Sequence, residues 1–208
     1  MSQTMIRQSD KWVKRLLPFY LFSLLLSLSS CSEVDNTVEE YDNWLTKNTV
    51  FVASLATDSM ATGNFVRYKS WNYDASIAGG DTEYIYVKEE IRGSGTECPE
   101  YTDTVLVHYS GRLLPSLTHT DGYRFDASFE GTFSPDTSLP ARFALNSGSL
   151  INGFITALMH MHVGDTWTVY IPYTLGYGVT TSGSIPAYST LIFQIQLAEI
   201  KKLKAVTE

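Results

Sequence analysis

The sequence predicts an α+β domain in which an antiparallel sheet carries one short helix on its apolar face. From residue 83 onward, apolar and polar side chains alternate in short segments, the pattern of strands with one buried and one solvated face. Residues 149–159 break this pattern, because their apolar side chains recur at helical spacing. The length of 208 residues suits one domain with an extension, or two small domains.

The amino terminus has the features of a secretory signal peptide. An apolar run at 16–28 follows four basic residues, Arg7, Lys11, Lys14 and Arg15. The run is too short for a stable membrane span. Its end, Leu28-Ser29-Ser30-Cys31, resembles a bacterial lipobox, where a signal peptidase cuts before a Cys that becomes lipid-modified. We therefore expect residues 1–30 to be removed and Cys31 to anchor the protein to a membrane of the bacterial cell envelope, periplasmic or surface-exposed.

The charge balance argues against nucleic-acid binding. The chain has 22 acidic and 15 basic residues, a formal net charge of -7, and the signal peptide carries four of the basic ones. An acidic protein repels polyanions, and no Lys/Arg cluster interleaved with aromatics offsets this. With Cys31 lipidated, Cys98 has no intrachain partner, so we expect no disulfide and an unreactive thiol.

Residues 31–82 are predicted to form a tether and a helical, loop-rich extension. Thr37-Val-Glu-Glu40 resembles a capping box, and Val38, Tyr41 and Leu45 fall on one stripe, which predicts a helix from Thr37 to about Leu55. The stripe suits packing onto the core, with dimerisation as the alternative. Residues 61–80 are rich in Gly, Asn, Ser and Asp and are predicted to be a connecting loop.

The remaining elements follow in order. Strands are expected at Glu83–Glu90, Thr104–Tyr109, Ala141–Leu145, Thr166–Ile171 and Leu191–Ile200. In the fourth of these, Trp167, Val169 and Ile171 share the face that we expect to be buried. The helix at 149–159 follows Ser147 and Ser149, either of which is expected to cap it. Residues 203–208 are left as a C-terminal tail.

The sequence is poor in the motifs of covalent or cofactor chemistry. It contains no nucleophile elbow, phosphate loop or dinucleotide fingerprint. His160 and His162 have a spacing that metals use on strands, but they lie where a helix ends, so a solvated helix end is favoured over a metal site. No metal or cofactor is expected.

Aromatic residues are plentiful instead, at 13% of the chain. That inventory suits rotation about an X-Pro bond, whose barrier of roughly 18–20 kcal/mol reflects amide resonance. No bond is broken, so no acid, base or nucleophile is needed. A dry aromatic pocket for the proline ring, with a few donors for flanking carbonyls, would favour the twisted amide.

A series of motifs in this chain resembles the consecutive motifs of the FKBP-type peptidyl-prolyl cis/trans isomerases. They are Val107-His-Tyr-Ser-Gly111, Phe125-Asp126, Leu150-Ile-Asn-Gly-Phe154, Met161-His-Val-Gly164, Tyr170-Ile-Pro172, Leu175-Gly-Tyr-Gly178, Ile185-Pro186 and Thr190-Leu-Ile-Phe193. The resemblance covers about Glu83 to Lys202. It implies an isomerase domain at 83–202, with a curved antiparallel sheet wrapped on one short helix, acting on proline-containing polypeptides among exported proteins.

The resemblance also implies roles for individual residues. Asp126 would accept a hydrogen bond from Tyr109 beside the twisting amide, and Tyr177 would donate its hydroxyl to a substrate carbonyl. These are the expected catalytic residues. The expected substrate-binding residues are Phe154 as the floor, where the family usually has Trp, Phe125, Ile185 and Phe193 as walls, Leu150 at the rim and the backbone N–H of Ile151.

Some positions depart from the family pattern. Ala141 stands where a second aromatic is common, and we expect Phe129 or Phe133, in the long loop after Asp126, to fill the gap. Ser149 stands where an acidic residue is frequent. The alternative to an isomerase is therefore a non-catalytic FKBP-scaffold module that binds peptides or acts as a chaperone.

Overall fold

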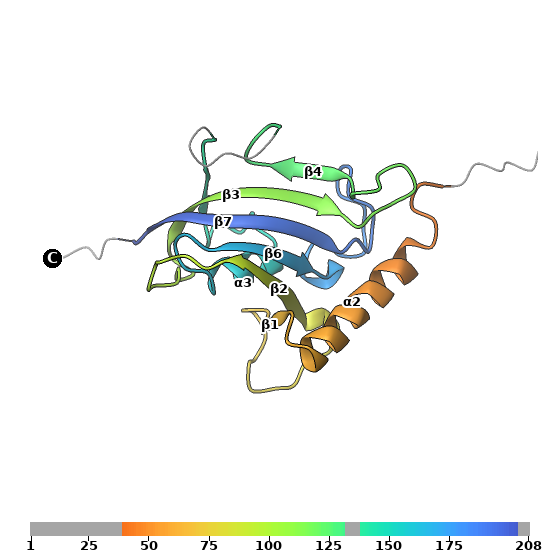
Figure 1. Ribbon diagram of the computed structural model, residues 1–208, viewed down its shortest axis with the longest axis horizontal. Coiled ribbons are helices and arrows are strands. Elements are labelled where there is room, and N and C mark those ends of the chain that lie inside the picture. The colour runs from red at the N-terminus through yellow and green to blue at the C-terminus, as the bar shows by residue number, and fades with distance from the viewer. Residues whose placement is uncertain (1–38, 132–137, 204–208) are drawn as a thin grey trace, which may run out of the picture. The chain divides into compact units, whose positions relative to one another are not determined.

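Seven antiparallel strands form one sheet, and a short helix lies on one face of it. A longer helix from the N-terminal extension also packs against the sheet (Figure 1). The structure is a computed structural model that describes residues 39–131 and 138–203. The expectations for the signal peptide, Cys31, Thr37, Val38 and Phe133 lie outside the described residues.

The sheet has the order β1-β2-β6-β7-β3-β4, with β5 also paired to β3. The strands are β1 (Val66–Lys69), β2 (Tyr84–Ile91), β3 (Thr104–Leu113), β4 (Arg124–Ala127), β5 (Ala141–Ala144), β6 (Thr166–Ile171) and β7 (Leu191–Lys201). The helices are α2 (Trp44–Ala61) and α3 (Asn152–Leu158), with short 3-10 turns η2 (Asp81–Glu83) and η3 (Tyr173–Leu175).

Strand β3 is the central connection of the sheet. It pairs with β7 along its whole length, from Thr104↔Lys201 to Leu113↔Leu191. Its other side is shared: β5 pairs with residues Thr104–Val107, and β4 pairs with Ser110–Arg112. Each of these neighbours therefore has its position along the sheet fixed by the hydrogen-bond register of a single strand.

The predicted alternation is confirmed in β7, which pairs with β3, and in β6, which pairs with β7. In β6, Trp167, Val169 and Ile171 are at most 3% exposed. In β7, alternate residues from Leu191 to Leu197 are buried, and the glutamines between them face the other side. These apolar side chains form one core under α3.

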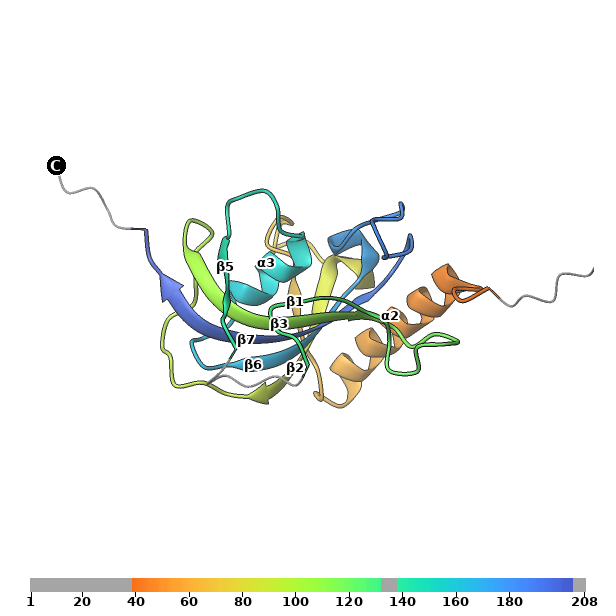
Figure 2. The ribbon, with the colours of Figure 1, turned by 90° about the horizontal axis from the view of Figure 1, so that it is seen from above.

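Helix α3 lies on one face of the sheet, as Figure 2 shows from above, and packs closely against it. A Cβ on Gly153 would lie 2.3 Å from Cγ2 of Ile171, so only glycine permits this approach. The expected serine cap is wrong. The helix begins at Asn152 after Ile151, without a side-chain cap, and the Ser147 and Ser149 hydroxyls bond each other at 2.8 Å instead.

The helix of the extension starts later than its capping-box motif predicts. Residues 39–43 form a turn that ends at Asn43 in the left-handed region, with φ 53°, and α2 begins at Trp44 and runs on to Ala61. Glu40 does not cap it. Its carboxylate instead accepts hydrogen bonds from Ser116 Oγ and from the Thr118 N–H at 3.0 Å, in a distant loop. A long-range partner therefore replaces the local one.

Helix α2 covers the sheet face opposite α3. Val52, Leu55 and Ala56 pack with Tyr86 of β2, and the Phe51 ring lies 5.7 Å from the ring of Tyr170 in β6. Tyr170 alternates with the core residues of its strand, so it points away from α3. The apolar side of α2 is thus used in packing onto this chain, as the core-packing interpretation predicts.

Two short strands were missed by the sequence pattern. β1 lies inside the segment predicted to be loop and pairs with β2, for example at Tyr68↔Ile85. β4 carries Phe125 and Asp126 and pairs with β3. Each has four residues, too few for alternation to stand out from a loop.

The Glu40 contact predicts a specific dependence of stability on pH. The pKa of Glu40 is lowered from 4.5 to about 2, chiefly because Ser116 donates a hydrogen bond to the carboxylate. A lowered folded-state pKa means that the stabilisation is complete above about pH 4.5 and disappears as the pH falls to about 2. We expect Glu40→Gln to lower the urea midpoint at pH 7, with the difference from the native chain shrinking across that window.

The control for this experiment is Glu39→Gln. Glu39 is exposed and its side chain makes no hydrogen bond with another residue in the described part of the chain, so this substitution removes one charge without the loop contact. A Glu40→Gln difference that stays constant down to pH 2 would contradict the assignment.

Candidate functional site

A groove of about 150 Å³ lies between the start of α3 and the aromatic end of the sheet. Its lining residues are Tyr109, Asp126, Phe143, Ser149, Leu150, Ile151, Phe154, Tyr177 and Phe193. They come from β3, β4, β5, β7, α3, the segment 149–151 just before α3 and the turn after η3. Segments that are far apart in the sequence therefore converge on one concave surface.

The floor of the groove is aromatic. Phe154 on α3 is 3% exposed, and its ring contacts the rings of Phe193 at 5.1 Å and Tyr109 at 5.8 Å, both edge to face. Phe143 from β5 completes this side, with its ring 5.9 Å from that of Phe154. Edge-to-face packing fixes these rings in place and leaves a floor that excludes water from a bound apolar group.

One glycine in β3 allows two further aromatic rings to meet. A Cβ on Gly111 would lie 2.6 Å from ring atoms of both Phe125 and Phe193. Without it, Phe125 and Phe193 stand edge to face with centroids 5.5 Å apart. Gly111 also pairs with Asp126, so the same position brings β4 and its carboxylate against the groove.

The polar part of the site centres on Asp126. Tyr109 donates its phenolic O–H to Asp126 Oδ2 at 2.8 Å. The pKa of Tyr109 is raised by burial, then by this hydrogen bond and the negative charge of Asp126. Burial, with a smaller contribution from Asp126, also raises the pKa of Tyr177. Both phenols therefore keep their protons at neutral pH and remain donors.

Two donors are available to a bound ligand. Ile151 is the residue before the first turn of α3, and its N–H makes no hydrogen bond with any other residue that the structure describes. Helix N-termini leave such groups unpaired by construction. Tyr177 is 41% exposed, and within the described ranges its hydroxyl likewise makes no hydrogen bond. The two donors border the same groove.

Two of the expected substrate-binding residues do not line the groove. Phe125 supports it from behind through Phe193. Ile185 is 5% exposed and belongs to the core next to it. Conversely, Phe143 and Ser149 line the groove although neither was assigned a role. Phe143 follows the exposed Arg142 in β5, so strand alternation was the signal that could have identified it.

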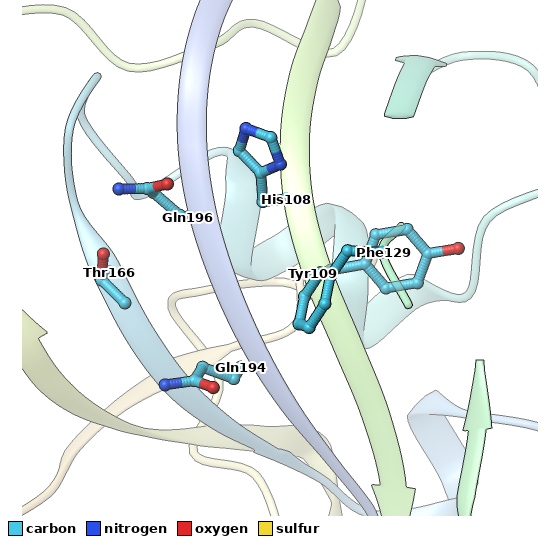
Figure 3. A pocket seen from close by; sticks show the side chains of 6 residues that line it. All are labelled: His108, Tyr109, Phe129, Thr166, Gln194 and Gln196. Carbon is cyan, nitrogen blue, oxygen red and sulfur yellow. The ribbon is translucent and has the colours of Figure 1, made fainter. Parts of the chain in front are cut away.

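Of the two residues expected to replace an aromatic at Ala141, the structure describes only Phe129, which does not line the groove. Ala141 pairs with Val107 in the sheet, and the wall on this side is formed by Phe143. Phe129 instead lines a separate hollow of about 30 Å³, shown in Figure 3 with His108, Gln194, Gln196 and Thr166. Because the glutamines alternate with the buried residues of β7, this hollow lies on the sheet face opposite the groove floor.

The histidines with metal-like spacing have other contacts. His160 lies against Tyr68, with ring centroids 4.2 Å apart, and its Nδ1 is 2.8 Å from the Thr156 carbonyl oxygen. His162 lies 3.5 Å from Cys98 Sγ. Among the described residues, no three His, Cys, Asp or Glu side chains are grouped as metal ligands would be. In the same part of the chain, no helix is both long and apolar enough to cross a membrane.

Comparison with known proteins settles the family. Residues 95–198, half of the chain, match the family described as FKBP-type peptidyl-prolyl cis-trans isomerase. The chain belongs to this family. The matched residues include all of the groove residues. They do not include helix α2 and strands β1 and β2, which come earlier in the chain.

Relatives support the FKBP assignment over different lengths. The chain is 42% identical to the macrophage infectivity potentiator of Trypanosoma cruzi over 111 residues, which are 53% of this chain and 50% of that protein. It is 30% identical to the FKBP-type peptidyl-prolyl cis-trans isomerase FkpA of Aeromonas hydrophila over 171 residues, 82% of this chain and 58% of that protein. The chain thus spans between half and about three fifths of the length of these relatives.

A solved structure shares the FKBP fold. The crystal structure of a peptidyl-prolyl cis-trans isomerase from Pseudomonas syringae superposes with a TM-score of 0.54 at 25% sequence identity, covering 80% of this chain and 99% of that one. The predicted curved antiparallel sheet with a short helix is therefore confirmed at the level of the fold.

The Tyr109–Asp126 pair predicts a measurable shift in a phenol. Asp126→Asn removes the negative charge that disfavours the phenolate, so we expect the pKa of Tyr109 to fall. NMR titration of tyrosine ring carbons measures this. The pKa of Tyr86 is raised by burial and by Asp81, so it should not move with Asp126 and is the internal control. An unchanged Tyr109 pKa would show that the hydrogen bond is absent in solution.

Proposed function

We propose that this chain is a peptidyl-prolyl cis/trans isomerase that binds proline-containing segments in the groove floored by Phe154. The observation that carries the proposal is the combination in one groove of a dry aromatic floor, a Tyr109–Asp126 hydrogen bond and two donors that have no partner among the described residues. Membership of the FKBP family supports the same activity.

The apolar floor acts on the barrier itself. Rotation about the X-Pro bond costs roughly 18–20 kcal/mol because the twisted amide loses its resonance. The planar amide is polar and well solvated in water, whereas the twisted amide has less charge on its oxygen. A proline ring packed on Phe154 brings the amide into an environment with little water, which disfavours the planar form relative to the twisted one.

The polar groups hold the ends of the substrate while its centre rotates. The N–H of Ile151 and the hydroxyl of Tyr177 donate to carbonyl oxygens that flank the twisting bond. Asp126 is held by Tyr109 at 2.8 Å and lies beside the amide, where its fixed charge faces the amide dipole. No group in this scheme gains or loses a proton.

A non-catalytic peptide-binding or chaperone module is the second candidate. The observation that favours it is the small side chain at Ala141, which leaves Phe143 as the aromatic on that wall. A less enclosed groove could bind peptides without holding them firmly enough to favour the twisted amide.

We also propose that the protein is exported and lipid-anchored in the cell envelope. The basic start, the apolar run at 16–28 and the lipobox-like end at Cys31 support this. Its substrates would then be exported proteins with X-Pro bonds. Uncatalysed isomerisation of these bonds takes tens of seconds or longer, slow enough to limit folding.

The activity is tested with a short X-Pro peptide by NMR exchange spectroscopy. We expect the mature chain to accelerate exchange, and Tyr177→Phe and Asp126→Val each to lower kcat/KM about fivefold or more, as the loss of one net hydrogen bond implies. Tyr73→Phe removes a hydroxyl from an exposed tyrosine outside the groove and is the matched control. Peptide binding without any acceleration would support the binding module and refute the isomerase.

The anchor is tested by Cys31→Ala in a bacterial host. We expect the native protein to incorporate labelled fatty acid and to sediment with membranes, and the variant to lose both properties, because a lipid chain contributes about 0.8 kcal/mol of membrane affinity per buried CH₂. Cys98→Ala is the matched control and should leave both unchanged. Equal sedimentation of the native and Cys31→Ala proteins would contradict lipidation at this cysteine.

A further inference from the structure

We propose that helix α2 positions the substrate groove, by holding the segment 176–190 through Asn48 and Trp44. This segment, called the Tyr177 loop below, joins η3 to β7 and carries Tyr177 near its start. The inference rests on the function proposed above. Trp44 and Asn48 lie outside the matched residues 95–198, so the inference assigns the extension of this chain a role at the site.

Asn48 makes the first of the two contacts. It lies in the second turn of α2 and is 1% exposed, which is unusual for an amide side chain. Its Nδ2 donates to the Trp44 carbonyl at 2.7 Å, and its Oδ1 accepts from the buried N–H of Thr190 at 2.6 Å. A buried amide is costly unless it is paired, so this geometry fixes one docking position of the helix against the end of the Tyr177 loop.

Trp44 makes the second contact one turn earlier. Its indole Nε1 donates to Ser189 Oγ at 2.8 Å, and Ser189 Oγ in turn donates to the Pro186 carbonyl at 2.7 Å. Trp44 is 6% exposed and belongs to the main core. The same helix face therefore holds residues 186–190 by both packing and hydrogen bonds.

The held residues are connected to Tyr177 by the backbone. The N–H of Tyr188 donates to the Gly178 carbonyl at 3.0 Å, and the N–H of Gly178 donates to the Tyr173 carbonyl at 2.9 Å. Tyr188 has a φ of 63°, a left-handed conformation that a bulky residue keeps only when its surroundings impose it. Its ring packs edge to face on Tyr173 at 5.3 Å. The residue after Tyr177 is thus tied to the part of the loop that α2 holds.

The consequence concerns the population of the binding-competent loop. If the contacts from α2 are weakened, the Tyr177 loop samples other conformations, and the apparent dissociation constant rises in inverse proportion to the competent fraction. Once a peptide is bound in the correct geometry, the twisting step itself is unaltered. A positioning role therefore raises KM and leaves kcat nearly constant.

The test uses Asn48→Ala, which removes the acceptor for the Thr190 N–H, and Trp44→Phe, which removes the indole donor and keeps a ring in the core. We expect each to raise KM and the peptide dissociation constant about fivefold, the change that corresponds to one net hydrogen bond, with kcat within about twofold of the native value. Amide hydrogen exchange at Tyr188 and Thr190 should become faster in both variants.

Val52→Ala is the matched control on the same helix. Val52 is 3% exposed and packs with Tyr86, on the sheet face opposite the groove. We expect it to lower the unfolding midpoint while leaving KM, the dissociation constant and exchange at Tyr188 unchanged. If Val52→Ala raises KM as much as Asn48→Ala does, the effect is general destabilisation and the positioning role is wrong.

The remaining outcomes separate this inference from the proposed activity. If the native chain binds the peptide but does not accelerate its isomerisation, the isomerase is refuted, while the dissociation constants and the exchange rates still test the positioning. Trp44→Phe preserves ring packing, so it decides the matter if Asn48→Ala does not fold. Unchanged peptide affinity and unchanged exchange at Tyr188 in the folded variants would overturn the inference.

Discussion

The hydrogen-bond register of β3 is the constraint on which the groove depends. This strand pairs with β7 on one side and with both β5 and β4 on the other, so one backbone sets the positions of three neighbours. Tyr109 comes from β3 itself, Asp126 from β4, Phe143 from β5 and Phe193 from β7. A slip of one residue would turn each of these side chains to the opposite face. The glycine at 111 adds a local requirement, since any side chain there would separate Phe125 from Phe193.

The division between apolar and polar parts of the groove follows from the same sheet. Phe154 and Phe193 are almost fully buried, whereas Asp126 is exposed at the rim. Tyr109, which bonds Asp126, is partly buried. Burial and the neighbouring carboxylate both raise the pKa of Tyr109, so its phenol keeps the proton that it donates to Asp126. The arrangement provides an oriented charge, protonated donors and an apolar floor. In the proposed isomerase, these groups favour the twisted amide over the planar one without any proton transfer.

Sequence patterns correctly predicted those strands and helices whose own side chains alternate or repeat clearly. The alternation of Trp167, Val169 and Ile171 located β6 at its observed bounds, because one face of that strand is buried along its length. The helix predicted from Thr37 begins only at Trp44. Glu40 of the capping-box motif binds the Ser116–Thr118 loop instead, and a contact between residues so far apart in sequence has no local signature. Strands β1 and β4 were missed because four residues carry too little pattern. The groove residues came from the family resemblance rather than from periodicity, and Phe143 was overlooked although its strand had been predicted.

Asn48 is a polar residue that interrupts the apolar side of α2, and this interruption has a structural role. Because it is polar and lies on the packed side, Asn48 lowers the amphipathicity of the helix. From the sequence pattern alone, its side chain would be placed in solvent. A buried amide needs a partner, however, and the partner is the N–H of Thr190, which immediately precedes Leu191. Leu191 pairs with both Leu113 of β3 and Ile171 of β6. The helix therefore fixes the point where the Tyr177 loop enters the sheet. The position of this loop at the groove thus depends both on the extension and on the strand pairing of the FKBP domain.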